Sequence, residues 1–227
     1  QIMNILRANP EQLFEYGPFT VRRQRPGEAL SPLVSVDLMS LKLDARIPMQ
    51  QHWNEEVFTY LWRGSMQHQD SNGERTQLSA KRVMVVNAGD GVQYEESVPL
   101  FEAELLQAVI RPAQPGGEAM TQVLERDQGI MSNGWTELAG PEESDAPLEL
   151  RQAAYIYDTL LERNHTLDVP ALPGFVAYLV VLEGSIRIGE ARLGRGDAVS
   201  GLAAGSEITG DRDANLVCFL IKPDHAA

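Results

Sequence analysis

One histidine of this chain lies close in sequence to several side chains that could bind a metal ion or a small molecule. His52 stands in residues 50–56, which read Gln-Gln-His-Trp-Asn-Glu-Glu. Because the side chains of a strand alternate between its two faces, Gln50 and His52 are expected to point the same way. The same rule places Tyr94 and Glu96 on one face. If both pairs face the inside of one barrel, an amide, an imidazole, a phenol and a carboxylate converge there.

The chemistry of these four groups favours a metal site that is incomplete. Imidazole and carboxylate are good ligands for iron, manganese or nickel, and two histidines with one carboxylate form the usual site of non-haem iron oxygenases. His52 and Glu96 supply two of these three ligands. The amide oxygen of Gln50 is an uncharged donor, and Tyr94 binds well only as phenolate, which a pKa of about 10 disfavours near neutral pH. The alternative is a hydrogen-bonded group inside the barrel without a metal.

The elements that must position these groups are β-strands. From Phe19 onward, apolar runs of about four to eight residues alternate with clusters of Gly, Pro, Asn, Asp and Ser, which is typical of an all-β protein. A short helix is expected over residues 9–17, where a proline stands at the first helical position and Gly17 at the end. The clearest hairpin spans Ser65 to Leu78, with residues 70–73 as its turn.

An internal repeat indicates two β units of similar size. Residues 63–68 return as residues 183–188, each after an apolar run, so that Gly64 corresponds to Gly184. Two tandem copies are too few for a solenoid, and each is expected to close as its own barrel. The segment 112–117, rich in Pro and Gly, separates them. The prediction is an N-terminal domain over residues 1–117 and a C-terminal domain over residues 118–227.

The other histidines and the single cysteine have simpler expected roles. His68 corresponds to Ile188 in the repeat, which predicts an inward position beside the candidate ligands rather than metal binding by His68 itself. His165 and His225 are expected in exposed loops. Cys218 lies in an apolar run, where a thiol is usually inert packing. A lone cysteine cannot form an internal disulfide, so nothing indicates an oxidising compartment.

The overall charge excludes some classes of partner. The chain has 19 basic and 32 acidic residues, a net charge of −13, so a nucleic-acid backbone or an anionic membrane surface is not an expected partner. No apolar stretch is long enough for a transmembrane helix, and the first residues lack a signal-peptide pattern. The expected location is the cytoplasm.

Three segments between residues 50 and 96 resemble the pirin family of two-cupin proteins. The family reads H-P-H-x-x-x-E-T-V-T-Y-x-x-x-G, then H-x-D-S-x-G, then T-A-G-x-G-I-x-H-S-E. Residues 50–64, 68–73 and 87–96 follow this register without a gap. The segment with Gln107 before Ile110-Arg111-Pro112 also resembles the family's closing strand. The resemblance is specific over roughly the first half of the chain and weaker beyond it.

The resemblance implies two tandem cupin barrels with few short helices, and one metal, usually iron, held in the N-terminal barrel by three histidines and one glutamate. Glu56 occupies the position where many cupins outside the pirins have a carboxylate ligand, so His52, Glu56 and Glu96 form an alternative set. The expected cofactor is iron, or manganese, nickel or zinc, weakly bound or absent. At the four family ligand positions this chain has Gln50, His52, Tyr94 and Glu96.

The resemblance leaves three functions open. Some members of the family oxidise flavonols such as quercetin with O₂, and others are regulatory partners of transcription factors. The leading hypothesis is a pirin-like protein with a degenerate N-terminal metal site, whose first barrel binds a small molecule or serves regulation. The second is a metal-dependent dioxygenase of the quercetin 2,3-dioxygenase type. The third is a module without an active site that binds a protein partner through an outer barrel face.

Overall fold

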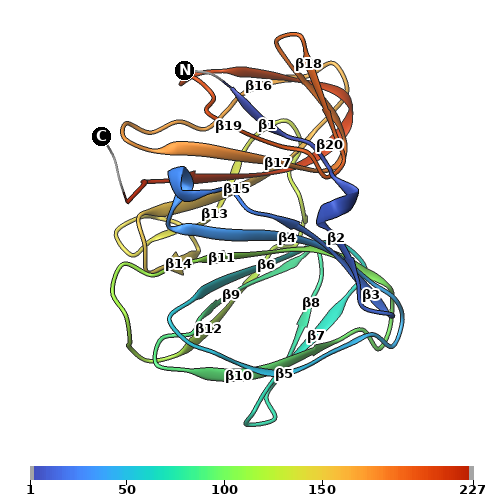
Figure 1. Ribbon diagram of the computed structural model, residues 1–227, viewed down its shortest axis with the longest axis vertical. Helices are drawn as coiled ribbons and strands as arrows, with labels where there is room; N and C mark the ends of the chain where they lie inside the picture. Colours follow the sequence, from blue (N-terminus) through green and yellow to red (C-terminus); the bar gives the residue numbers. More distant parts are fainter. Residues whose placement is uncertain (1–2, 225–227) are drawn as a thin grey trace.

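The computed structural model describes residues 3–224, and β-strands make up most of the chain. Its two helical segments are single 3-10 turns, η1 (Pro10–Gln12) and η2 (Glu28–Leu30). The strands form three sheets, which we call the large, central and small sheets. They lie in successive layers from the top to the bottom of Figure 1. The all-β class expected from the sequence is confirmed.

The first barrel consists of the central and small sheets, packed face to face. The buried side chains between them include Met39, Leu61, Met66 and Leu105. The central sheet has the order β12 (Met120–Glu125), β9 (Arg82–Asn87), β6 (Glu56–Arg63), β11 (Ala103–Ile110), β4 (Leu33–Leu41), β3 (Phe19–Gln24) and β2 (Leu13–Glu15). The small sheet has the order β5 (Arg46–His52), β10 (Val92–Ser97), β7 (Met66–Asp70) and β8 (Arg75–Leu78).

The second barrel is formed by the large sheet, which closes around its own core of side chains such as Leu179, Leu216 and Cys218. Its main path runs β1 (Asn4–Leu6), β19 (Ala198–Ser200), β17 (Val176–Ile188), β20 (Glu207–Ile221), β15 (Ala154–Leu161), β13 (Thr136–Pro141) and β14 (Leu148–Leu150). Two short strands extend it, with β16 (Thr166–Asp168) on β20 and β18 (Ala191–Gly194) on β17.

A further core lies between the two barrels. Strands β6 and β11 of the central sheet send alternate side chains, such as Phe58, Tyr60 and Leu106, away from the first barrel's interior. These pack against Tyr178 and Phe219 of the large sheet. Strands β6 and β9 of the central sheet are therefore buried on both faces, which explains why they read as nearly continuous apolar runs. The central sheet provides a rigid platform for any site inside the first barrel.

The structure corrects one expectation about the elements and confirms another. The predicted helix over residues 9–17 is only the single turn η1, and Leu13–Glu15 instead pair with Thr20–Arg22 as the edge strand β2. Pairing with β3 satisfies this backbone in place of helical hydrogen bonds. The predicted hairpin is confirmed as β7 and β8, and the Asp70 carboxylate accepts hydrogen bonds from the turn amides of Asn72 at 2.9 Å and Glu74 at 3.0 Å.

Two strands pair across the predicted boundary between residues 117 and 118. Strand β12 comes after that boundary but pairs with β9 in the central sheet. Strand β1, drawn in blue in Figure 1, lies among the orange and red strands of the large sheet, where it pairs with β19. Each barrel thus takes one strand from the far side of the boundary. These crossings tie the two barrels together through backbone hydrogen bonds.

Candidate functional site

A cavity of about 510 Å³ lies between the central and small sheets of the first barrel. Strands β5 and β10 line it on one side, and strands β3, β4, β6 and β11 line it on the other. The apolar part of its wall includes Phe19, Val21, Met39, Ile47, Val57 and Val109. Its polar side chains are Tyr16, Arg23, Asp37, Gln50, His52, Glu55, Tyr94, Glu96 and Gln107.

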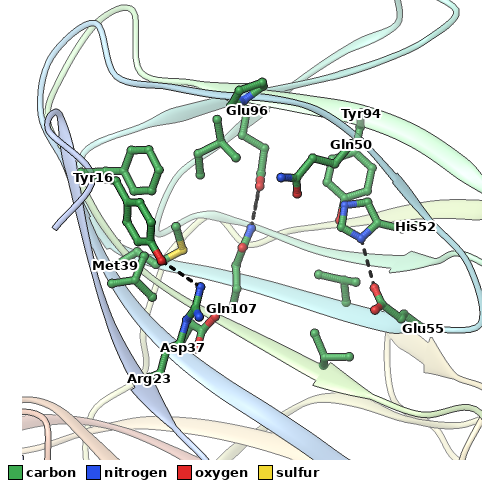
Figure 2. A pocket seen from close by; sticks show the side chains of 16 residues that line it. Tyr16, Arg23, Asp37, Met39, Gln50, His52, Glu55, Tyr94, Glu96 and Gln107 are labelled. Atoms are coloured by element: carbon green, nitrogen blue, oxygen red, sulfur yellow. Dashed lines mark hydrogen bonds and ion pairs between the residues drawn. The ribbon is translucent and has the colours of Figure 1, made fainter. Parts of the chain in front are cut away.

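The structure brings the four residues at the family ligand positions to this cavity. Strand β5 presents Gln50 and His52, and the adjacent strand β10 presents Tyr94 and Glu96 (Figure 2). Tyr94 pairs with Gln50, whereas Glu96 pairs with Ile47, so β5 has one extra residue between these pairs. Such a bulge bends the strand locally and changes where its side chains point. The extra residue lies before Gln50, so Gln50 and His52 still point the same way, as do Tyr94 and Glu96.

His52 is held by two contacts inside the cavity. Its Nδ1 lies 3.1 Å from Oε2 of Glu55, which orients the ring. Its ring also stacks almost flat on the ring of Tyr94, with centroids 4.4 Å apart and an angle of 7° between the planes. One face of the imidazole is thus covered by an aromatic ring. Glu55, the residue before β6, is a contributor that the sequence reasoning missed.

Glu96 is a buried carboxylate with one hydrogen-bond donor. The side-chain amide of Gln107 donates to its two oxygens, at 2.8 and 3.0 Å, and the same nitrogen lies 3.3 Å from Oγ1 of Thr59. Burial raises the pKa of Glu96 above its ordinary value, which the hydrogen bond from Gln107 and the charge of His52 offset in part. Because Gln107 occupies only part of the acceptor capacity of the carboxylate, Glu96 can accept a further hydrogen bond from a ligand.

Tyr94 is enclosed between two histidines. On the side away from His52, its ring meets His68, with centroids 4.5 Å apart. Burial raises the pKa of Tyr94 well above its ordinary value, and the negative charges of Glu96 and Glu55 raise it further. Burial lowers the pKa of His68 to about 4, so this imidazole is neutral near pH 7. The inward position predicted for His68 agrees with its burial beside these residues.

The alternative carboxylate Glu56 lies outside the cavity. It is the first residue of β6 and shares a face with Phe58 and Tyr60, toward the second barrel. Its Oε1 accepts hydrogen bonds from the side-chain amide of Asn87 at 2.8 Å and from the backbone N–H of Arg151 at 2.5 Å. The structure therefore does not bring Glu56 to His52 and Glu96.

These residues do not fit the metal centre that the family resemblance implies. Within residues 3–224, no group of three or more His, Cys, Asp or Glu side chains has an arrangement that could hold a metal ion. Tyr94 would have to ionise in a buried site that already holds Glu96. Gln50 offers only a neutral oxygen. The strong donors are then one imidazole and one carboxylate, two of the three ligands that a non-haem iron site uses.

The remaining candidates lie elsewhere. Cys218 is fully buried in the second barrel, and burial raises the pKa of its thiol. His165 is exposed in a loop, as expected, and His225 lies outside the described residues. The helical segments of residues 3–224 are single turns, far short of the roughly 20 residues that a membrane-spanning helix needs.

The comparison with protein families matches both halves of the chain. The model of the Pirin family matches residues 9–110, and the model described as the quercetinase C-terminal cupin domain matches residues 137–219.

Individual relatives agree with these matches. The chain is 26% identical to the quercetin 2,3-dioxygenase of Escherichia coli K12 over 179 residues, which are 76% of this chain and 74% of that protein. It is 28% identical to a pirin-like protein of Caulobacter vibrioides over 174 residues, 75% of each chain.

The fold agrees as well. The bacterial pirin YhhW of Escherichia coli, solved in complex with nickel(II), superposes with a TM-score of 0.87 at 18% identity, covering 98% of this chain and all of that one. The quercetin 2,3-dioxygenase of Acinetobacter baumannii superposes with a TM-score of 0.80 at 20% identity, covering 97% of this chain and 86% of that one. The chain is a bicupin of the pirin family.

Proposed function

We propose that the first barrel binds a small molecule in its cavity, in a metabolic or regulatory role, and that its metal site is degenerate. The observation that carries this proposal is the flat stack of Tyr94 on His52 at two of the four ligand positions. A metal ion binds to an imidazole nitrogen in the plane of the ring. An aromatic ring lying on the face of the imidazole contributes packing and no strong donor.

The energetics of the donors support the same proposal. Ionising an ordinary phenol of pKa about 10 costs roughly 4 kcal/mol at pH 7. The surroundings of Tyr94 increase this cost, because burial and the carboxylates of Glu96 and Glu55 all disfavour a phenolate. Gln50 carries no charge to compensate a divalent cation. The cavity itself retains the size and the mixture of apolar and polar groups that a small-molecule site needs.

Restoring the missing ligands tests the proposal. Nickel(II) and iron(II) are titrated by calorimetry into the wild-type protein and into Gln50→His/Tyr94→His, which has the family's three histidines and one glutamate. The double variant is expected to bind one metal ion per chain more tightly than the wild type. The increase in metal affinity should exceed roughly 10–100-fold, which is the loss of affinity when a hydrogen-bond partner of a metal ligand is removed.

The control is His52→Ala in both backgrounds. It should remove the binding gained by the double variant and change little in the wild type. Tight binding of one metal ion by the wild type, lost in His52→Ala and not improved by the added histidines, would contradict a degenerate site.

A metal-dependent dioxygenase of the quercetin 2,3-dioxygenase type is the second candidate. It is favoured by His52 and Glu96, which keep an imidazole and a carboxylate in the cavity, and by the name of the relative in Escherichia coli. Oxygen uptake with quercetin, lost on chelation and restored by iron, manganese or nickel, would support it. The absence of uptake with all three metals, in a preparation where Gln50→His/Tyr94→His is active, would reject it.

A further inference from the structure

The cavity wall formed by the central sheet carries one polar row. The row consists of Thr59 on β6, Gln107 on β11, Asp37 on β4 and Arg23 on β3, and each residue pairs with the next across neighbouring strands. The row beside it, from Leu61 to Val21, is apolar throughout. A single polar row in an otherwise apolar wall indicates positions that orient a ligand.

Arg23 at the end of this row is held in place, and its donors are not all used. One terminal nitrogen donates to the hydroxyl of Tyr16 at 3.3 Å, and its guanidinium lies over the ring of Phe14, 4.9 Å from the centroid. Its Nε is buried without a hydrogen-bond partner in the described chain. Asp37, the adjacent acid, forms its ion pair with Arg25 at 3.4 Å, and burial raises the pKa of Asp37 while the charges of Arg25 and Arg23 oppose this rise. The guanidinium of Arg23 therefore keeps unused donors, which are the groups that bind a carboxylate.

Across the cavity from this row, on β10 of the small sheet, Glu96 offers an acceptor. Gln107 donates to Glu96, and the Glu96 oxygens have no other hydrogen bond within residues 3–224. Neighbouring strands lie about 4.8 Å apart, so the β3 backbone at Arg23 is roughly 10 Å from the β11 backbone at Gln107. Figure 2 shows Arg23 on one side of the cavity and Glu96 above Gln107. Met39 and Val109 also line this cavity, and its volume of about 510 Å³ lies in the range of small-molecule sites.

Charge fixes the orientation of such a ligand. Among the residues that line the cavity, Arg23 is the only arginine and there is no lysine. The one histidine that lines the cavity, His52, is paired with Glu55. The other charged lining groups are the carboxylates of Asp37, Glu55 and Glu96. An anionic group is therefore attracted at Arg23 and repelled at Glu96, while a hydroxyl donor is accepted at Glu96.

We propose that Arg23 is the anion-binding end of the cavity and that the ligand class is a small hydroxylated aromatic carboxylate. Its carboxylate pairs with the Arg23 guanidinium, its ring lies along the apolar wall, and its hydroxyl donates to Glu96. The inference rests on the proposed function, since it names the ligand of the same cavity. It distinguishes this cavity from one built for a neutral ligand.

The test compares an acid with its neutral analogue. The binding of 4-hydroxybenzoate and of 4-hydroxybenzamide is measured by calorimetry on the full chain. The wild type is expected to bind the acid roughly 10–100-fold more tightly, as one charge-assisted interaction allows. Arg23→Gln should remove this preference, because it weakens the acid far more than the amide, and Arg23→Lys should restore part of it. Arg46→Gln, a change at an exposed arginine outside the cavity, is the matched control and should keep the preference.

The other end is tested with benzoate, which lacks the hydroxyl. Glu96→Gln should weaken 4-hydroxybenzoate more than benzoate, and circular dichroism checks that each variant is folded. Equal affinity of the wild type for the acid and the amide would overturn the ligand class and leave the proposed function standing. Absence of binding by both, and by neutral phenols, would overturn both. Acid preference that persists in Arg23→Gln would overturn the role of Arg23.

Discussion

The side chains of the cavity differ in how well the protein satisfies them. His52 has Glu55 and the face of Tyr94, whereas Glu96 has one hydrogen-bond donor within residues 3–224, the amide of Gln107. A buried carboxylate with one donor is costly, because few protein groups replace the water that it loses. In a metalloprotein the cation would offset that cost. Here the residue that stabilises Glu96 is Gln107, on the facing sheet.

Replacing Gln107 shows how much Glu96 depends on it. Gln107→Leu removes the hydrogen bonds to both carboxylate oxygens, and we expect a loss of roughly 1–3 kcal/mol in the free energy of unfolding near neutral pH. Urea denaturation measures the effect. Gln77→Leu, which removes an exposed amide–amide hydrogen bond to Gln67, is the control and should change little. An equal effect of the two variants would show that Gln107 is not what stabilises Glu96.

At the scale of the elements, the internal repeat reflects a shared close approach of backbones. Gly64 directly follows β6 and Gly184 lies within β17, with φ of +72° and +78°. A Cβ at Gly64 would lie 1.8 Å from the carbonyl oxygen of Glu102, and one at Gly184 would lie 2.0 Å from that of Asp213. The neighbouring strands shift register at both places. Both barrels therefore need glycine at the same structural position.

Gly64→Ala is expected to destabilise the protein by about 3 kcal/mol or more, since it combines a strained φ with a clash against backbone. Gly73→Ala is the matched control. Its φ is +84°, but nothing lies within 4 Å of a Cβ there, so only a conformational cost of about 1 kcal/mol is expected. Thermal and urea unfolding of the two variants measure the difference. Similar losses would show that the close approach to Glu102 does not matter.

At the scale of the whole molecule, the two barrels share a buried polar cluster as well as an apolar core. Asp158 of the large sheet is fully buried and accepts a hydrogen bond from the Tyr60 hydroxyl at 2.7 Å. Arg126, which follows β12, pairs with the same oxygen at 2.8 Å. Asn215 donates to the Tyr60 hydroxyl at 3.1 Å. Strand β12, which lies beyond the predicted boundary, is thus followed directly by Arg126, whose positive charge compensates the buried Asp158 carboxylate.

Removing that cation should destabilise the whole molecule in a pH-dependent way. Burial raises the pKa of Asp158 above its ordinary 3.8, and Arg126 opposes this rise. A raised pKa means that the folded state binds the proton more tightly, so stability falls as pH rises above about 3.8. Arg126→Met leaves an unpaired buried charge, with an expected loss of about 3–5 kcal/mol near neutral pH that shrinks on acidification.

Urea denaturation across mildly acidic to neutral pH measures this dependence. Asp158→Asn/Arg126→Met removes the buried charge and should lose the additional pH dependence. Arg46→Met, at an exposed ion pair with Glu95, should change little at any pH. A constant deficit of Arg126→Met across this range would contradict the role assigned to Asp158.

The sequence by itself determined the features that depend on local periodicity. It predicted the all-β class, the hairpin, the inward face of His68 and the convergence of β5 with β10, because a strand alternates its side chains every second residue. The alternation within β6 also indicates on which face of the strand Glu56 lies. This residue shares the parity of Phe58 and Tyr60, which face the second barrel, while Val57 lines the cavity.

Only the tertiary structure decided which strands face one another. The turn at Asn54, with φ of +50°, breaks the alternation after His52, so Glu55 enters the cavity and Glu56 leaves it. The exchange of β1 and β12 between the sheets joins segments far apart in sequence. The polar row ending at Arg23 depends on the register of four strands. Register and sheet order are set by contacts between distant segments, and no local pattern in one strand records them.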